Sequence, residues 1–340
     1  MALGIKVPLQ EAEKTKRYLI EKEMLDTSYR PRRDKTHIIF PVNQKYDGDY
    51  EARDYELNEH KNNVKAVPLR EALGEVLAEE ELDLAKTAYD VVGNIAIIEI
   101  PEELEHKEKE IATTLLKANP LVKTVLSKGS KHDGVYRTQA MKYLAGKETK
   151  VAEYKENGCT LKVDVEEVYF SARLSTERKR IAEQVKAGED ILVMFSGAAP
   201  YPCVFSKQTD AKEIIGVEIN PTGHEYGVEN IKRNKCENVK LYCGDVREVV
   251  PKLDKTFDRI VMPLPKTAEE FLDATLQAAR KGAIVHMYAF YHQNEFHKAT
   301  EEIDKHCKKA GREYEILDFV KAGQHAPRTY RVCVDFKLHN

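Results

Sequence analysis

Acidic, basic and aromatic side chains lie close together in the segment Tyr169-Phe-Ser-Ala-Arg-Leu-Ser-Thr-Glu-Arg178. The segment contains one carboxylate, Glu177, and two guanidinium groups, Arg173 and Arg178. A carboxylate can accept a proton, while guanidinium groups can donate hydrogen bonds to the carbonyl oxygen of an electron-rich base. The tyrosine and phenylalanine at its start offer rings on which a base can stack. The segment therefore predicts an enzyme that acts on a nucleobase.

Glu177 has a second interpretation. It lies early in a helix predicted from Ser175 to Lys186, where the helix dipole favours a carboxylate in the first turn. The crowding of cationic and aromatic side chains around it, with Tyr136 and Arg137 upstream, favours the catalytic interpretation. Both interpretations stay open at this point.

The elements that must position these residues follow from Leu174 onward, where short apolar runs alternate with amphipathic stretches. This pattern is typical of a doubly wound parallel α/β sheet. Strands are expected at 191–195, 213–219, 239–243, 258–262 and 283–289, with helices at about 221–234, 246–252, 267–281 and 294–310. Residues 314–319 and 330–338 should form a terminal antiparallel pair. A Rossmann-like sheet with such an ending is the usual shape of S-adenosylmethionine-dependent methyltransferases, which is an analogy of folds.

Ligands of open α/β sheets bind beyond the carboxyl ends of the strands. After the first strand, Phe195, Ser196 and Gly197 allow a tight turn with close backbone approach to a ligand, although an ordinary strand–helix turn would look the same. The sequence has no Gly-x-Gly-x-x-Gly pattern there, which disfavours NAD. After the fourth strand, Pro263 opens a stiff loop that could wall a flat base pocket or be a plain rigid turn.

Two carboxylates follow the second and third strands. Glu218 can accept hydrogen bonds from both hydroxyls of a ribose, or it can be a carboxylate at the entry of the helix that begins near Pro221. Its position after a Rossmann strand favours the ribose. Asp245 can accept from an adenine amino group, with Val246 packed on the ring, and it can equally cap the next helix. One carboxylate has enough lone pairs for both roles.

The first 168 residues read as two smaller units. Residues 1–60 predict a small α/β unit with a helix at 10–23, a strand at 37–42 and an acidic linker at 46–60. Its basic loop, Tyr29–Lys35, is either an RNA-binding surface or a solvated turn. Residues 61–168 predict an α+β domain ahead of a domain at 169–340. Its expected elements are helices at 69–84 and 101–118, two strands within 89–100, and strands near 122–127, 150–154 and 160–165.

Composition limits the class of protein. The 340 residues are 42% hydrophobic and 33% charged, which supports packed domains and excludes a disordered chain. A net charge of −3 means that any nucleic-acid surface must be local. The sequence has no apolar run of ~20 residues, as a membrane helix needs, and no signal peptide is evident. Its six scattered cysteines predict reduced thiols in a cytoplasmic protein. We expect a monomer. Neither cysteines nor histidines have the spacing of a metal site.

Several motifs, in order, resemble the archaeal and eukaryotic tRNA (guanine-37-N1)-methyltransferase family. They are Tyr136-Arg137 with Leu144–Gly146, Lys155–Gly158, Val168–Arg178, Glu218–Pro221, Gly244–Glu248 and Ala326–Tyr330. The resemblance covers the chain from about residue 64 to the end, and we expect it to extend to the N-terminal unit. The Pro200-Tyr-Pro202 sequence and the Pro263–Lys266 loop are similar to one archaeal branch, in which methylation of a later tricyclic wyosine intermediate is also known.

The resemblance implies specific roles. Glu177 would remove the guanine N1 proton, and Arg137 would bind guanine O6. S-adenosylmethionine would be the cofactor, held by Arg178, Phe195, Ser196, Gly197, Glu218, Asp245, Val246 and Pro263. Tyr169 and Arg173 would position the anticodon loop, and the N-terminal unit would bind the tRNA elbow through Arg30, Arg32 and Arg33.

Two loops depart from the family pattern. Its Phe-Ala-Gly-Val-Gly-Pro-Phe is here Phe195–Pro202, and its Asn-Leu-Pro is here Pro263–Pro265, so one amide side chain is lost from the expected base pocket. One alternative function is a sister enzyme that transfers the aminocarboxypropyl group of the same cofactor. That enzyme has Gly-Asn before the glutamate, where this chain has Ser175-Thr176. Another alternative is a non-catalytic RNA-binding relative, which cofactor binding would distinguish.

Overall fold

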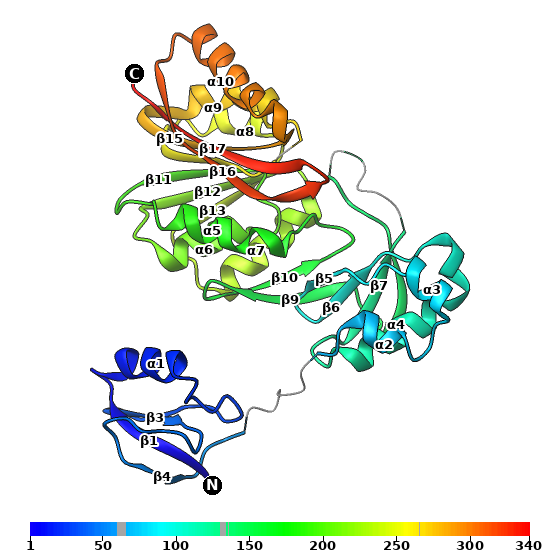
Figure 1. Ribbon diagram of the computed structural model, residues 1–340. Coiled ribbons are helices and arrows are strands. Elements are labelled where there is room, and N and C mark those ends of the chain that lie inside the picture. The colour runs from blue at the N-terminus through cyan, green and yellow to red at the C-terminus, as the bar shows by residue number, and fades with distance from the viewer. Residues whose placement is uncertain (60–65, 130–133, 135, 265) are drawn as a thin grey trace. The chain divides into compact units, whose positions relative to one another are not determined.

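The computed structural model describes residues 1–59, 66–129, 134, 136–264 and 266–340, which fall into two compact units, Met1–Val67 and Pro68–Asn340 (Figure 1). Three parts of the sequence predictions lie outside the described residues: His60–Lys65 between the predicted units, part of the loop before Tyr136, and Pro265. Each unit is described by itself.

The N-terminal unit is a four-stranded antiparallel sheet, among its described residues, with one helix, α1 (Ala12–Glu21). The strands, in the order β2-β3-β1-β4, are Arg32–Arg33, His37–Pro41, Ala2–Pro8 and Ala52–Tyr55. The prediction of an unstructured acidic linker is wrong at β4, which pairs with β1 along the sheet edge. The edge strand is held by backbone hydrogen bonds, and its two central side chains are exposed, so it needs no apolar alternation.

The middle part of the second unit contains a four-stranded sheet, among the described residues, in the order β5-β6-β7-β8. These strands are Tyr89–Val92, Ile95–Ile98, Thr124–Lys128 and Met141–Gly146, and the last was not predicted. The parallel β6 and β7 are joined through η1 (Glu102–Lys107) and α4 (Glu108–Ala118). The predicted helix 69–84 is interrupted, forming α2 (Leu69–Leu73) and α3 (Glu79–Leu84). A hairpin of β9 (Val151–Glu156) and β10 (Cys159–Asp164) turns at Asn157-Gly158, as predicted.

The rest of the second unit confirms the predicted Rossmann-like fold. Among the described residues its sheet has seven strands in the order β13-β12-β11-β14-β15-β17-β16. In chain order, β11 to β17 are Asp190–Met194, Glu213–Glu218, Val239–Cys243, Phe257–Met262, Ala279–His292, Tyr314–Ala326 and Thr329–Leu338. The first five are parallel, while β17 pairs antiparallel with both β15 and β16. Strand order reverses between β11 and β14, which is where ligands of such sheets bind.

Helices cover both faces of this sheet (Figure 1). One face carries α5 (Ser175–Ala182), α6 (Pro200–Gln208) and α7 (Pro221–Arg233), and the other carries α8 (Val246–Lys252), α9 (Leu272–Ala278) and α10 (His297–Lys309). Short 3-10 turns lie at Ala172–Leu174, Ala268–Phe271 and Gln293–Glu295. No range was predicted for α6, which follows the predicted strand–helix turn and begins at Pro200, since the first turn of a helix tolerates proline.

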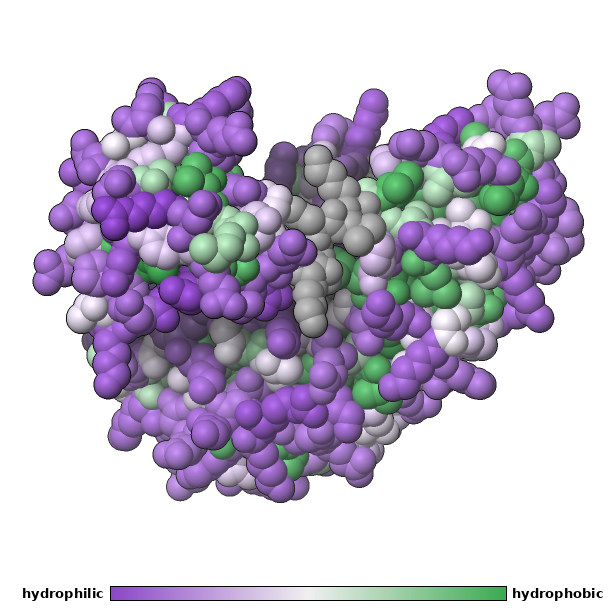
Figure 2. Space-filling view, turned by 90° about the horizontal axis from the view of Figure 1, so that it is seen from below, coloured by the Kyte–Doolittle hydropathy of each residue, from purple (hydrophilic) through white to green (hydrophobic). Residues whose placement is uncertain are grey.

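The face shown in Figure 2 is mainly hydrophilic, with separate hydrophobic patches. In the described part of the chain, no helix combines the length and the apolar character needed to cross a membrane.

Candidate active site at the carboxyl edge of the sheet

The loop after β11 has an unusual backbone. Phe195, Gly197 and Ala199 all have positive φ, at 58°, 53° and 61°, a conformation that non-glycine residues adopt only at a cost and that concentrates at functional sites. An added Cβ at Gly197 would lie 3.6 Å from the Tyr169 carbonyl oxygen. The predicted cofactor loop therefore lies directly against the start of the Tyr169–Arg178 segment.

Glu218, at the end of β12, accepts hydrogen bonds from backbone amides of the loop after β11 and of the residues that follow it. One carboxylate oxygen accepts from Gly197 at 2.6 Å and the other from Asn220 at 2.8 Å. Burial raises the pKa of this carboxyl group. Because a carboxylate offers about four acceptor positions, these bonds leave capacity for a ribose hydroxyl.

Asp245 caps α8. Its carboxylate accepts from the backbone amide of Arg247 at 2.8 Å and forms an ion pair with the Arg247 side chain at 2.5 Å, which lowers the pKa of Asp245. The Arg247 guanidinium lies over the Phe271 ring at 5.1 Å, and Phe271 packs against Phe195. The side chain of Val246 is buried in the core beneath this edge. The adenine role of Asp245 remains a prediction.

Arg178 is fully engaged with its own chain. It is 1% exposed and forms two hydrogen bonds to Glu156 on β9, at 2.5 and 2.6 Å. Its guanidinium also lies 5.5 Å from the Phe170 ring and 5.7 Å from the Tyr201 ring. These are the contacts of a structural residue that joins α5 to β9, so they lend no support to a cofactor role.

Two other predicted residues differ in exposure. Arg173 is exposed and forms an ion pair with Asp90 on β5. Pro263, directly after β14, is partly buried. In the N-terminal unit the three loop arginines, Arg30, Arg32 and Arg33, are all exposed, and the Arg32 guanidinium donates to the carbonyl oxygen of Glu56 at 3.0 Å.

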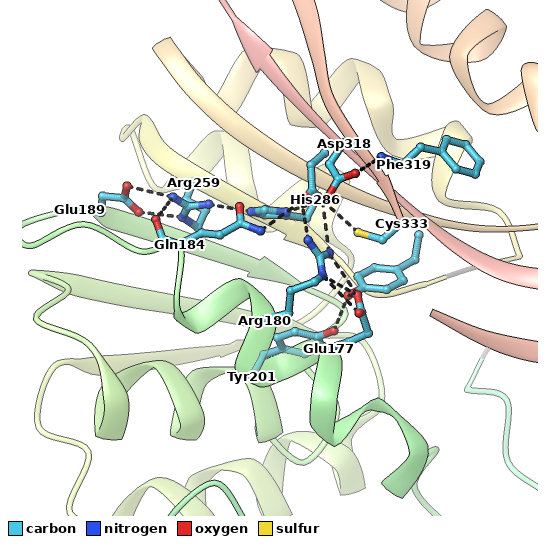
Figure 3. Close-up of polar contacts among 12 residues, drawn as sticks. Glu177, Arg180, Gln184, Glu189, Tyr201, Arg259, His286, Asp318, Phe319 and Cys333 are labelled. Carbon is cyan, nitrogen blue, oxygen red and sulfur yellow. Dashed lines mark hydrogen bonds and ion pairs between the residues drawn. The ribbon is translucent and has the colours of Figure 1, made fainter. Parts of the chain in front are cut away.

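Glu177 is buried, with 7% exposure, and its carboxylate is held from two sides (Figure 3). Tyr288 on β15 donates its hydroxyl hydrogen to Oε2 at 2.9 Å, and Arg180 donates to both oxygens at 3.0–3.2 Å. Tyr201 on α6 in turn donates to the Tyr288 hydroxyl oxygen at 3.0 Å. The carboxylate therefore has a fixed orientation and defined donors.

Arg180 links Glu177 to a deeper hydrogen-bonded network. It donates to Asp335 at 2.6 Å, and Asp335 binds His286 Nδ1 at 2.7 Å. His286 Nε2 lies 2.7 Å from the Arg259 guanidinium. Because a guanidinium can only donate, Nε2 must accept and the ring proton must sit on Nδ1. Burial lowers the pKa of His286, in agreement with this neutral tautomer.

Three side chains of this network could each offer a ligand atom to a metal ion. They are His286, Cys333 and Asp335, whose ligand atoms lie within 4.8 Å of one another, and they form the one such group among the described residues. Two guanidinium groups, from Arg180 and Arg259, already bind it. Their positive charges disfavour a cation there, so we interpret the grouping as a hydrogen-bond network. His286 and Arg180 keep the pKa of Asp335 below its usual range although burial acts in the opposite direction.

The pairing of β15 with β17 places these side chains on one face of the sheet. Three cross-strand pairs alternate along this face, in the order His286 with Asp335, Tyr288 with Cys333, and Phe290 with Arg331. Glu177 contacts the second pair, through Tyr288.

The third pair, at the carboxyl end of β15, leads to Arg137. Arg331 donates to the Tyr169 hydroxyl at 3.1 Å, and its guanidinium lies over Phe290 at 5.2 Å. Arg137 is half-buried, and its pKa is lowered by burial and by the nearby Arg331, against the effect of Tyr169. Glu177 thus lies beside the second cross-strand pair, and Arg137 lies near Arg331 of the third pair, on the same face of the sheet.

Sequence reasoning missed Arg180, Tyr288 and Asp335. Tyr288 is 111 residues from Glu177, and Asp335 is 155 residues from Arg180, so only the fold brings them together. The one local signal was the position of Arg180 three residues after Glu177 on the same helix, which allows a side-chain pair.

Comparison with known proteins covers nearly the whole chain. Residues 152–317 match the TRM5/TYW2 methyltransferase domain, residues 69–149 the TYW2 N-terminal domain, and residues 4–51 the tRNA methyltransferase 5 N-terminal domain. The chain is 37% identical to tRNA (guanine(37)-N(1))-methyltransferase Trm5b of Pyrococcus abyssi, over 99% of both chains. It is 31% identical to the tRNA (guanine(37)-N(1))/4-demethylwyosine(37)-methyltransferase Taw22 of Nanoarchaeum equitans, over 74% of this chain and 99% of that one. The structure of aTrm5 in complex with tRNALeu matches with a TM-score of 0.72 at 32% identity, over 99% and 100% of the two chains.

Proposed function

Because the chain belongs to the TRM5/TYW2 methyltransferase family, we propose that it transfers a methyl group from S-adenosylmethionine to N1 of guanine 37, the base 3′ of the anticodon in tRNA. The observation that carries this proposal is the full-length similarity to the Pyrococcus abyssi Trm5b, which includes the N-terminal unit. The match to Taw22 covers only 74% of this chain.

The residues present fit the cofactor. Glu218 retains capacity to accept from the ribose, and Asp245, two residues after β13, can accept from the adenine amino group. The loop at Phe195–Ala199, with positive φ at three positions, is bonded to Glu218 through Gly197. When bound, S-adenosylmethionine supplies an electrophilic methyl group. The role of this edge of the sheet is to hold it next to the Tyr169–Arg178 segment, against which the loop lies.

Two side chains carry the proton chemistry. Guanine N1 bears a proton at neutral pH and gains a free lone pair only when that proton leaves. Glu177 accepts the proton, while Arg137 donates to O6 and stabilises the negative charge that develops there. Tyr169 and Arg173 position the anticodon loop.

The parts of the chain divide the remaining work. We assign binding of the tRNA elbow to residues 1–60, through the exposed Arg30, Arg32 and Arg33. Residues 61–168 form the middle α+β domain. Residues 169–340 bind the cofactor and carry out catalysis. Pro200–Pro202 supports placement in the archaeal branch that has this loop. The protein acts as a cytoplasmic monomer. All six cysteines are free, and all except Cys243 are buried, which suits a reducing compartment.

The test is incubation with labelled S-adenosylmethionine and tRNA transcripts, followed by mass spectrometry of the nucleosides. A transcript with guanine 37 should yield 1-methylguanosine, and a matched transcript with adenine 37 should yield none. A third arm uses tRNA that carries 4-demethylwyosine, since methylation there would extend the substrate range. A mass gain of an aminocarboxypropyl group would instead support the sister reaction, and no product in any arm would contradict the proposal.

A further inference from the structure

The buried network around Glu177 contains unequal numbers of charges. The neutral His286 adds none, and the members that carry charge are three carboxylates and two guanidinium groups: Glu177, Asp335, Glu189, Arg180 and Arg259. One negative charge therefore lacks a partner within the network. A proton accepted by Glu177 from a substrate would make the positive and negative charges of the network equal in number.

The other groups that face Glu177 are neutral. They come from α6 and the two strands packed on α5: Tyr201, Tyr288 and Cys333. Burial raises the pKa of each of these three groups above its ordinary value. Among the described residues, Arg180 on α5 is therefore the charged group that contacts Glu177, and Asp335 on β17 is paired with Arg180.

The two oxygens of Glu177 differ in their hydrogen bonds. Oε2 accepts from the Tyr288 hydroxyl at 2.9 Å and from two Arg180 nitrogens at 3.0 and 3.1 Å. Oε1 accepts only the Arg180 Nε contact at 3.2 Å, among the described residues. The more heavily bonded oxygen is the poorer base, because each donor stabilises its negative charge.

We propose that Tyr288 is a positioning residue for the proposed methyl transfer, which holds Oε2 of Glu177 and leaves Oε1 as the atom that takes the guanine N1 proton. In this step the N1–H bond breaks, its electron pair stays on N1, and the proton bonds to Oε1. The inference rests on the proposed function. It adds a residue that acts through Glu177 and need not contact the base.

Tyr288→Phe removes this hydroxyl and keeps the ring. The single-turnover methylation rate should be measured against pH, with saturating cofactor and tRNA. The hydroxyl stabilises the ionised carboxylate, so its loss should move the midpoint of the rate profile upward by about one pH unit, the value expected for one hydrogen bond to a charged group. The plateau should fall by roughly tenfold, since the carboxylate loses its fixed orientation.

Two further variants complete the experiment. Tyr201→Phe removes the donor to Tyr288 and should shift the midpoint in the same direction by a smaller amount, because hydrogen bonds in a chain strengthen one another. Tyr314→Phe is the matched control, since this hydroxyl binds Asp304 on α10, away from the network, and its profile should equal that of wild type.

An unchanged midpoint and plateau in Tyr288→Phe would overturn the inference. A lower melting temperature with an unmoved midpoint would do the same, because it would show a merely structural role. If Tyr288→Phe does not fold, the midpoint of Tyr201→Phe decides. Wild-type rates in Glu177→Gln would reject both the base and its positioning residue, whereas the proposed function is judged separately by whether wild type forms 1-methylguanosine.

Discussion

Glu218 accepts a 2.6 Å hydrogen bond from the backbone amide of Gly197, which ties the end of β12 to the loop after β11. The bond fixes a loop whose backbone is left-handed at Gly197 and at two non-glycine positions, Phe195 and Ala199. The loop shape is therefore set by the chain itself, and a cofactor need not organise it on arrival, which lowers the entropic cost of binding.

Asp245→Ala should weaken S-adenosylmethionine binding by about 1–3 kcal/mol, because the adenine amino group would be buried without a hydrogen-bond acceptor. Calorimetry measures this directly. Arg247→Ala is the matched control, because Arg247 now competes for the same carboxylate, and its removal should leave the affinity equal or higher. Equal affinity in Asp245→Ala and wild type would reject the adenine assignment.

Glu177→Gln should lower the single-turnover methylation rate by roughly 10²–10⁴-fold, the usual contribution of a positioned base. Glutamine can keep its oxygen at the Oε2 position, where Tyr288 and Arg180 donate, so the fold and the affinities for cofactor and tRNA should change little. Rapid-quench measurement of labelled methyl transfer gives the rate. A rate near that of wild type would place the base elsewhere.

Arg137→Ala should lower the same rate by about 10²–10³-fold, through lost stabilisation of charge on O6. Lys281→Ala removes one positive charge at the opposite end of β15 from Phe290 and should leave the rate unchanged. If both variants lose activity equally, net charge is responsible and the O6 contact is not.

Replacing Arg30, Arg32 and Arg33 together by alanine should weaken the binding of full-length tRNA more than that of an anticodon stem-loop. Binding should also fall steeply with salt in wild type, because phosphate contacts release counterions, and less steeply in the triple variant. Filter binding at several salt concentrations measures both effects. Equal losses on the two RNAs would separate this loop from the elbow.

Acid should destabilise the protein through His286. Its folded-state pKa is lowered, so below the ordinary value of 6.5 the unfolded chain takes a proton that the folded chain does not. The free energy of unfolding should therefore fall as pH drops from 7.5 to 5, by up to about 1.4 kcal/mol per pH unit for this one proton. The lowered pKa of Asp335 extends the loss to more acidic pH.

His286→Asn tests this contribution, because an amide can still donate to Asp335 and accept from Arg259 without titrating. Denaturant unfolding of both proteins at pH 7.5 and pH 5 gives the comparison. The variant should lose less stability than wild type over this interval, and an equal loss in both would assign the acid sensitivity to other groups.

The sequence predicted most elements of the larger sheet, because buried parallel strands are continuous apolar runs such as Ile191–Met194. It failed at β4 and β8, whose edge positions or mixed side chains leave little pattern. The prediction of Glu177 depended on local clustering with arginines, yet its observed partners include Tyr288, which no local pattern can indicate.

The cofactor role of Arg178 stays a prediction, and its contacts show what a sequence motif leaves open. Its neighbours in sequence suggested a ligand-binding role, whereas its partner, Glu156, lies on another element and occupies its guanidinium. A motif fixes which residues are near one another along the chain, but the direction of each side chain depends on which face of α5 packs on the sheet.

The position of β17 between β15 and β16 has a consequence for biosynthesis. The ribosome makes β17 after every other strand of this sheet, so the nascent protein spends time with an open edge on β15. Until β17 inserts, Arg180 lacks Asp335, and His286 has no carboxylate to bind. Products that terminate before β17 therefore cannot assemble the environment of Glu177.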